Sequence, residues 1–171
     1  MKIINYNVYG HINKHINVRK IEIVNQIFKN GIPDIICLQE ATDPIINLIL
    51  KKYKYYICSK PNDYVTKFKP EQNNVYLKNQ LEQGYLIILS KYKILKQNII
   101  YFENEFGEGI IHIQININNK LINIFNYHAT GGTFGQTEKA IEFKINKRIN
   151  EVKILNKLIK ENIDNSLIMG D

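Results

Sequence analysis

Short apolar runs recur along the chain and predict strands, because each run is bounded by polar or turn-forming residues. These runs lie at residues 2–6, 34–38, 53–58, 85–89, 98–102 and 166–169. The run Asp34–Leu38 is apolar at successive positions, which is typical of an inner strand that is covered on both faces. The pattern therefore predicts a sheet with at least one fully buried strand.

A hairpin is predicted where apolar and polar residues alternate strictly. Residues 110–117 place the isoleucines from Ile111 to Ile117 on one side and His112, Gln114 and Asn116 on the other. Asn118 and Asn119 tolerate the positive φ that a tight two-residue turn needs. Residues 121–127 are therefore predicted to return as the paired strand.

Apolar positions spaced by three and four residues predict three helices. The first covers residues 17–30 and stops before Gly31 and Pro33. The second opens at Asp43, predicted as the N-cap, with Pro44 in the first helical position. The third is long and precedes the last strand. Their predicted apolar faces are Ile21, Val24, Ile27 and Phe28; Ile45, Leu48 and Ile49; and Ile141, Ile145, Ile149, Val152, Leu155 and Ile159.

Composition narrows the class of protein without choosing a function. The chain has 171 residues, the size of one domain, and its net charge of +7 favours phosphate-bearing partners or anionic membrane surfaces. Its two cysteines, Cys37 and Cys58, provide neither a disulfide framework nor a paired metal motif, and are expected to fill the core. No apolar stretch is long enough to span a membrane, and the first strand leaves no room for a signal peptide, so we expect a cytoplasmic protein.

Four of the predicted strands end on a polar side chain that suits metal or phosphate chemistry. These residues are Asn7, Glu40, His128 and Asp171. In sheets covered by helices, strand ends that point the same way form an edge where ligands bind. Carboxylate and amide oxygens are ligands that Mg²⁺ accepts, an imidazole contacts phosphate, and a second carboxylate orients water. The four together are the minimum for metal-assisted hydrolysis of a phosphate ester.

Each of these residues also has an ordinary structural interpretation. Asn7 is equally well explained as a turn residue, and a single histidine such as His128 is more often a structural one. Glu40 is harder to dismiss, because a carboxylate directly after an apolar strand is costly to bury without a cation or a donor. Asp171 alone carries no meaning. Only the coincidence of the four supports a site.

The segments around these residues resemble, in order, the motifs of the endonuclease/exonuclease/phosphatase superfamily, also called the DNase I-like fold. The similar segments are INYNVYG, PDIICLQE, QGYLIILSKYKI, GEGIIHIQI, IFNYHATGG, RINEVKIL and LIMGD. The resemblance implies an α/β (α+β) fold, a four-layer α/β/β/α sandwich. It also implies that Asn7 and Glu40 bind the metal, Mg²⁺ with Mn²⁺ as an alternative, and that His128 and Asp171 are catalytic. His128 would contact the scissile phosphate, and Asp171 would position or activate the attacking water.

The chain also departs from the family pattern. An asparagine two residues after the last aspartate and a later Asp-His pair are absent. We therefore expect residues 1–171 to form a single domain of this type that ends before its final third, as a fragment or as a natural truncation. In either case, hydrolysis by this polypeptide alone is expected to be weak or absent, because residues that act as a catalytic unit lose most of their effect when one is removed.

Two sequence features bear on the substrate. Residues 51–78 contain seven lysines against two acidic residues, interleaved with tyrosines, which suits nucleic acid but also fits a solvated loop. The glycine-containing segment 129–137 after His128 is similar to that of sphingomyelinase-like members, and fits a plain flexible turn equally well. The expected function is an Mg²⁺-dependent phosphodiesterase, with nucleic acid ahead of a lipid phosphodiester. The alternative is a non-catalytic phosphate-binding or nucleic-acid-binding module. No obligate protein partner is implied.

Overall fold

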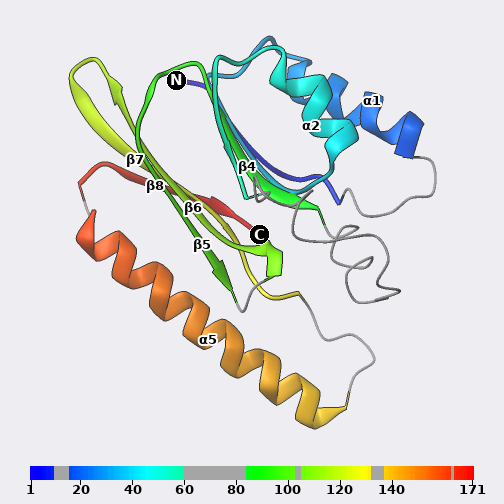
Figure 1. The fold of residues 1–171 in the computed structure, drawn as a ribbon, viewed down its shortest axis with the longest axis vertical. Helices are drawn as coiled ribbons and strands as arrows, with labels where there is room; N and C mark the ends of the chain where they lie inside the picture. The colour runs from blue at the N-terminus through cyan, green and yellow to red at the C-terminus, as the bar shows by residue number, and fades with distance from the viewer. Residues whose placement is uncertain (10–15, 60–83, 103–104, 132–136, 163) are drawn as a thin grey trace, which may run out of the picture.

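A computed structural model describes residues 1–9, 16–59, 84–102, 105–131, 137–162 and 164–171. Figure 1 shows two sheets stacked face to face, with α1 and α2 on the outer side of one sheet and α5 on the outer side of the other. The layer order is therefore α/β/β/α, as expected. The elements are β1 Ile3–Asn7, α1 Ile16–Phe28, β2 Ile35–Ala41, α2 Asp43–Leu50, β3 Tyr55–Cys58, β4 Tyr85–Ser90, β5 Ile94–Phe102, β6 Glu105–Ile117, β7 Lys120–His128, α5 Glu138–Glu161 and β8 Ser166–Gly170.

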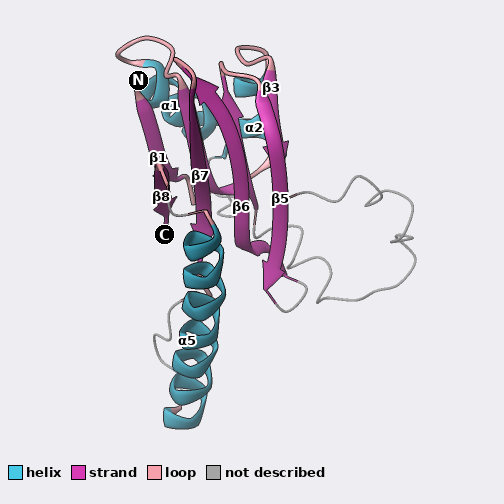
Figure 2. Ribbon diagram, turned by 90° about the vertical axis from the view of Figure 1, so that its left-hand side faces the viewer, coloured by secondary structure: helices cyan, strands magenta, loops and turns pink. Residues whose placement is uncertain are grey.

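Both sheets are mixed. The strand order is β1-β2-β4-β3 in the first sheet and β5-β6-β7-β8 in the second. The pairs β1–β2 and β7–β8 are parallel, and the remaining pairs are antiparallel. Within the described residues, β1 and β8 are edge strands of their sheets, and both lie at the same edge of the molecule in Figure 2. This arrangement brings the ends of four strands from two sheets to a common edge.

Three apolar clusters fill the spaces between the layers. The first lies between α1, α2 and the first sheet, the second between the two sheets, and the third between the second sheet and α5. Strand β2 contributes to both faces of its sheet: Ile36 and Leu38 contact the helices, whereas Ile35 and Cys37 face the other sheet. The doubly covered inner strand and the core role of Cys37 are therefore confirmed. Cys58 is partly buried against the first cluster.

The predicted hairpin is confirmed. Strands β6 and β7 pair in register from Gly109 opposite His128 to Ile117 opposite Lys120. Asn118 and Asn119 connect them with φ of 51° and 63°. The inward isoleucines Ile111, Ile113 and Ile115 are buried in the cluster between the sheets. Strict alternation predicts these positions well because one face of each strand is fully covered.

The predicted faces of α1 and α2 need correction. In α1 Ile21 is exposed and Ile23 is buried, and in α2 Leu48 is exposed and Ile46 is buried. The N-cap of α2 is Thr42, one residue before the predicted Asp43, which instead lies in the first turn. In each helix both candidates are apolar, so periodicity alone cannot choose between them. The angle at which the helix packs on the sheet decides which one is buried.

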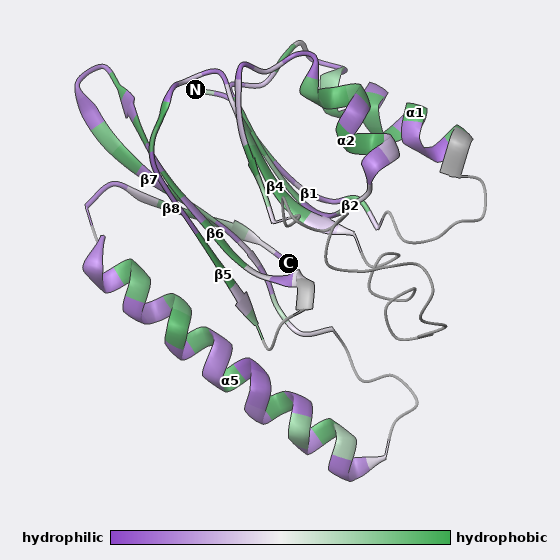
Figure 3. Cartoon of the chain, in the orientation of Figure 1, coloured by the Kyte–Doolittle hydropathy of each residue, from purple (hydrophilic) through white to green (hydrophobic). Residues whose placement is uncertain are grey.

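Helix α5 buries only part of its predicted apolar stripe. Leu155 is buried, and Leu158 and Ile159 pack beside it against the sheet. Ile145 and Ile149, nearer the N-terminal end, are about half exposed. Figure 2 shows the reason, since the N-terminal half of α5 extends past the ends of the strands. The hydropathy colouring of Figure 3 shows apolar segments distributed along the whole of α5. In the described part of the chain, no helix is both long and apolar enough to cross a membrane.

Candidate active site

The structure brings together all four side chains predicted from the strand ends. Ligand atoms of Glu40, His128 and Asp171 lie within 4.8 Å of one another. Asn7 joins the two acids, because its Nδ2 donates to Glu40 Oε1 at 2.8 Å and to Asp171 Oδ2 at 2.6 Å. His128 Nε2 lies 3.6 Å from Glu40 Oε1. Two residues come from each sheet or from its end, so the site straddles the junction of the sheets.

Glu40 reaches this cluster only because the backbone of β2 turns there. Ile36 and Leu38 point toward the helices, and strict alternation would send Glu40 the same way. Instead Glu40 has φ of 54°, and the pairing of β2 with β4 shifts register between Leu38 and Ala41. Such a bulge redirects a side chain. Backbone strain of this kind persists only where the surroundings enforce it.

Gly84 makes room for the turned backbone of Glu40. A Cβ at Gly84 would lie 2.4 Å from the main-chain carbon of Glu40, and Gly84 itself has φ of +79°. No other amino acid fits such a close approach without displacement. The glycine that opens the QGYLIILS segment is therefore explained by its contact with Glu40.

A short turn after β1 fixes Asn7. Its Oδ1 accepts a hydrogen bond from the Tyr9 amide at 2.8 Å. Arg19 on α1 donates to the carbonyl oxygens of Val8 and Tyr9, at 3.4 Å and 3.2 Å. These bonds orient the amide of Asn7 so that its nitrogen faces the two carboxylates. Arg19 was not predicted, because nothing in the helix pattern links it to the strand end.

The ring of His128 is held at both nitrogens. Nδ1 lies 2.5 Å from the Gly107 carbonyl oxygen, so Nδ1 carries a hydrogen and Nε2 faces Glu40. Burial lowers the pKa of the imidazole, but the neighbouring Glu40 and the Gly107 oxygen outweigh it. The pKa of His128 is consequently raised above its ordinary value of 6.5. The protonated ring, which can donate to an anion, is thereby favoured.

The main chain of Asp171 is hydrogen-bonded to the residues on either side of His128. Its amide donates to the Tyr127 carbonyl oxygen, and its own carbonyl oxygen accepts from the Ala129 amide, both at 3.0 Å. Gly170 precedes it and lies against the Tyr127 oxygen. The relative position of Asp171 and His128 is therefore set by main-chain bonds.

An amide network, defined here as the exposed Asn5 and the buried Gln39 and Asn126, adjoins the site. Gln39 Nε2 donates to Asn5 Oδ1 at 2.8 Å and to Asn126 Oδ1 at 2.5 Å. Asn5 Nδ2 in turn donates to the Gly170 carbonyl oxygen at 3.1 Å. Each member lies one or two residues before Asn7, Glu40 or His128 in its own strand. The network thus links the strands that carry the site.

Asn126 makes the connection between the sheets. It lies in β7, but its Nδ2 donates to main-chain oxygens of the other sheet, to Leu38 at 2.9 Å and to Ile87 at 3.0 Å. Asn126 and Gln39 are fully buried. Sequence reasoning missed the network, although its signal was present: a polar residue on the inward side of an apolar strand usually has a hydrogen-bonded partner.

The donor set fits a hard divalent cation. The carboxylates of Glu40 and Asp171 are close enough to repel each other unless a donor or a cation lies between them. Asn7 supplies that donor here, and a cation held beside Glu40 would relieve the same repulsion. For Asn7 to bind a metal through Oδ1, its amide would have to turn and release Tyr9. The cluster is therefore compatible with Mg²⁺ or Mn²⁺.

Two stacked mixed sheets covered by helices, with a polar cluster at their common edge, define a DNase I-like α/β sandwich. A model of the Endonuclease/Exonuclease/phosphatase family matches residues 4–163, and the chain belongs to this family. The resemblance seen in its motifs is confirmed. A comparison with curated protein sequences found no match.

Solved structures of low sequence identity share the fold. TDP2 from D. rerio, complexed with a single-strand DNA product, is similar with a TM-score of 0.68, 16% identity and coverage of 99% of this chain and 58% of that one. TDP2 from Caenorhabditis elegans has a TM-score of 0.62 and 18% identity, and the match covers 98% of this chain and 45% of that one. Sphingomyelinase C from Streptomyces griseocarneus has a TM-score of 0.64 and 16% identity, and the match covers 100% of this chain and 63% of that one. The chain spans 45–63% of the length of these three proteins.

The two sequence features that bear on substrate lie largely outside the described residues. Residues 60–83, which hold most of the basic segment 51–78, and residues 132–136 of the loop after His128 are not described. At the start of the basic segment, Tyr53 is buried and its hydroxyl donates to the Pro33 carbonyl oxygen at 2.9 Å. Tyr56 is exposed. Tyr53 therefore has a structural role.

Proposed function

We propose that the protein is an Mg²⁺-dependent phosphodiesterase, with Mn²⁺ as an alternative metal. The observation that supports this function is the cluster of Glu40, His128 and Asp171 within 4.8 Å, with Asn7 joining the two acids. Membership of the Endonuclease/Exonuclease/phosphatase family favours phosphoester chemistry. Fold alone does not define function, so the proposal depends on the site.

In the proposed mechanism, water attacks the phosphorus in line with the ester bond. Asp171 orients the water and accepts its proton, a bond forms between the water oxygen and phosphorus, and the ester P–O bond breaks. The leaving oxygen takes a proton from solvent. His128 Nε2, on the side of the ring turned toward Glu40, donates to a non-bridging phosphate oxygen. Its pKa is raised above the ordinary value, which favours the protonated ring that can donate.

Glu40 is the principal proposed metal ligand, with Asn7 next to it. When bound, the metal supplies charge that offsets the negative charge developing on the phosphate oxygens. Gly84 and the bulge in β2 hold Glu40 in place. The role of Asn7 in the bound state is either a ligand after its amide turns or a donor to the carboxylates, as it is here.

Nucleic acid is the proposed substrate, and a lipid phosphodiester is the second candidate. The net charge of +7 and the lysines of residues 51–78 favour a polyanion. One similar structure is described with a DNA product, and another is a sphingomyelinase. The alternative function is binding of phosphate without hydrolysis, because the chain spans less than two thirds of the length of these relatives.

Incubation with plasmid DNA, RNA and sphingomyelin vesicles, each with Mg²⁺, Mn²⁺ or a chelator, tests the function. For the 171-residue chain we expect metal-dependent cleavage of nucleic acid that is weak, and its loss in Glu40→Gln, which keeps the shape but not the charge. Asp34→Asn is the matched control, because Asp34 precedes β2 at the opposite end. Cleavage of sphingomyelin alone would select the second substrate. Binding of DNA without cleavage would select the binding module, and equal cleavage by Glu40→Gln would exclude Glu40 from the site.

A further inference from the structure

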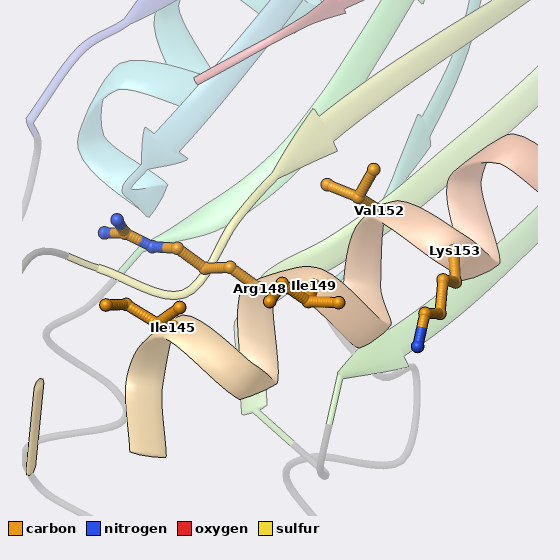
Figure 4. A pocket seen from close by; sticks show the side chains of 5 residues that line it. All are labelled: Ile145, Arg148, Ile149, Val152 and Lys153. Carbon is orange, nitrogen blue, oxygen red and sulfur yellow. The ribbon is translucent and has the colours of Figure 1, made fainter. Parts of the chain in front are cut away.

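Thr130, two residues after His128, is held through every polar group it has by one turn of α5. Its amide donates to Glu151 Oε2 at 3.0 Å, and its hydroxyl is hydrogen-bonded to Glu151 Oε1. Its carbonyl oxygen accepts from Arg148 Nε at 2.8 Å. Figure 4 shows Arg148 extending from α5 toward the segment after β7, away from Val152 and Lys153. Arg148 and Glu151 thus act on a single residue.

Glu151 is a buried carboxylate on α5, with only 2% of its surface exposed. A buried carboxylate is costly unless hydrogen bonds compensate, and the two bonds from Thr130 do so. Packing of α5 does not require this contact, since Leu155 already attaches the helix to the sheet through the apolar cluster with Phe102 and Phe125. The contact specifically fixes the segment after His128.

A second set of bonds ties the same segment to the residue that orients the imidazole. Glu108 accepts from the Gly131 amide at 3.1 Å, and its Oε2 lies 3.0 Å from the Thr130 hydroxyl, whose one hydrogen it shares with Glu151 Oε1. Lys147 of α5 lies 3.3 Å from Glu108. Gly107, the neighbour of Glu108 in β6, provides the oxygen that contacts His128 Nδ1. Both backbone segments that determine the position of His128 therefore meet at Thr130.

We propose that Glu151 and Arg148 are positioning residues, which act through Thr130 to hold His128 in the orientation that faces Glu40. This inference rests on the proposed function for its catalytic meaning, because it concerns the residue proposed to contact phosphate. It also assigns a role to the RINEVKIL segment that the strand-end residues leave unexplained. The competing role is purely structural, in which Glu151 merely attaches α5 to the sheet.

Glu151→Ala, Glu151→Gln and Leu155→Ala in the 171-residue chain separate the two roles. Glu151→Gln keeps an oxygen for the Thr130 amide and offers a donor to its hydroxyl, so it is the conservative variant. Leu155→Ala weakens attachment of the same helix without touching Thr130. The readouts are amide hydrogen exchange of Thr130 and the ring nitrogen resonances of His128 at one fixed pH. The His128 signals are identified by their absence in His128→Gln, and all samples are metal-free.

For Glu151→Ala we expect faster exchange at Thr130, by about tenfold or more, and shifted His128 ring resonances that indicate a weakened Nδ1 bond. Glu151→Gln should restore both, and Leu155→Ala should lower the thermal midpoint while leaving both unchanged. Unshifted ring resonances in Glu151→Ala, or an equal shift in Leu155→Ala, would overturn the proposal. If Glu151→Ala does not fold, Thr130→Val, which removes only the hydroxyl bonds, decides by the same criterion. Because no metal or substrate is present, failure of the proposed function leaves these results unaffected.

Discussion

Gln39 and Asn126 belong to different sheets, and the side-chain nitrogen of Gln39 donates to the side-chain oxygen of Asn126 at 2.5 Å in the buried space between them. Gln39 directly precedes Glu40, and Asn126 lies two residues before His128 in its strand. Apolar contacts between sheets tolerate small shifts, whereas directional hydrogen bonds do not. The bond therefore fixes how the acid of one sheet faces the imidazole of the other.

Asn126→Ala should destabilise the fold by about 2–3 kcal/mol, because the Leu38 and Ile87 carbonyl oxygens would stay buried without their donor. The free energy of unfolding from urea titration measures this loss. Asn116→Ala is the matched control, since Asn116 is an exposed asparagine of β6, and it should change stability by less than about 0.5 kcal/mol. Equal losses in the two variants would contradict a specific role for Asn126.

The strand ends carrying the site were predictable because each residue follows a continuous apolar run. Asn7, His128 and Asp171 continue the path of their strands, so a simple extrapolation of alternation places them correctly. Glu40 was predicted to lie at the correct strand end, but regular strand alternation does not explain the direction of its side chain. In a regular strand it would face the helices with Leu38, and its turn depends on Gly84 from another strand. Local pattern contains no information about that contact.

The interior of the site was less predictable than its outline. Arg19, Gln39 and Glu151 hold the segments that carry the site residues through contacts between different structural elements. The prediction of the buried face of α1 was wrong at one position for a similar reason. Ile21 and Ile23 are equally apolar, and only packing on the sheet decides that Ile23 is buried. Periodicity identifies an element and its approximate face, whereas tertiary contacts decide individual side chains.

Gly84→Ala should be much more damaging than Gly31→Ala. Both glycines have positive φ, +79° and +84°, so each substitution brings backbone strain of about 1–2 kcal/mol. Nothing lies within 4 Å of a Cβ at Gly31, whereas one at Gly84 meets Glu40 main-chain atoms at 2.4–2.8 Å. Overpacking should add about 1–3 kcal/mol at Gly84. Urea unfolding of the two variants in parallel measures the difference, and similar losses would show that the backbone of Glu40 yields easily.

His112 should make the fold less stable as the pH falls below its ordinary pKa of 6.5. Burial lowers the pKa of this imidazole, which stacks on Phe125 with ring centroids 4.4 Å apart. Its folded pKa lies below its unfolded value, so the unfolded chain binds more protons in this window and stability declines toward the folded pKa. His128, whose pKa is raised, contributes a slope of opposite sign near pH 6.5, but this contribution is common to the variants compared at His112.

Urea unfolding between pH 7 and about pH 5, above the usual carboxylate range, measures this slope. In His112→Phe the stacking surface remains but the titrating group is lost, so the decline should become shallower. His112→Gln provides a second non-titrating variant that can keep a bond to Asn123 Oδ1, which lies 3.0 Å from His112 Nε2. If the slopes of all three proteins coincide, His112 does not control stability in this range.

Mn²⁺ should stabilise the folded chain through Glu40. A cation that binds only the folded state at about 100 times its dissociation constant adds about 2.7 kcal/mol. For a domain of this size that corresponds to an increase of about 5–10 °C in thermal midpoint. Glu40→Gln removes the charge and should abolish the increase, while its shape still accepts the Asn7 bond. Asp34→Asn loses the charge and one of the two oxygens that accept from Lys2 and Lys91, at the opposite end of β2 from Glu40. Its midpoint should therefore fall but still respond fully to Mn²⁺. An undiminished response in Glu40→Gln would place the cation elsewhere on the protein.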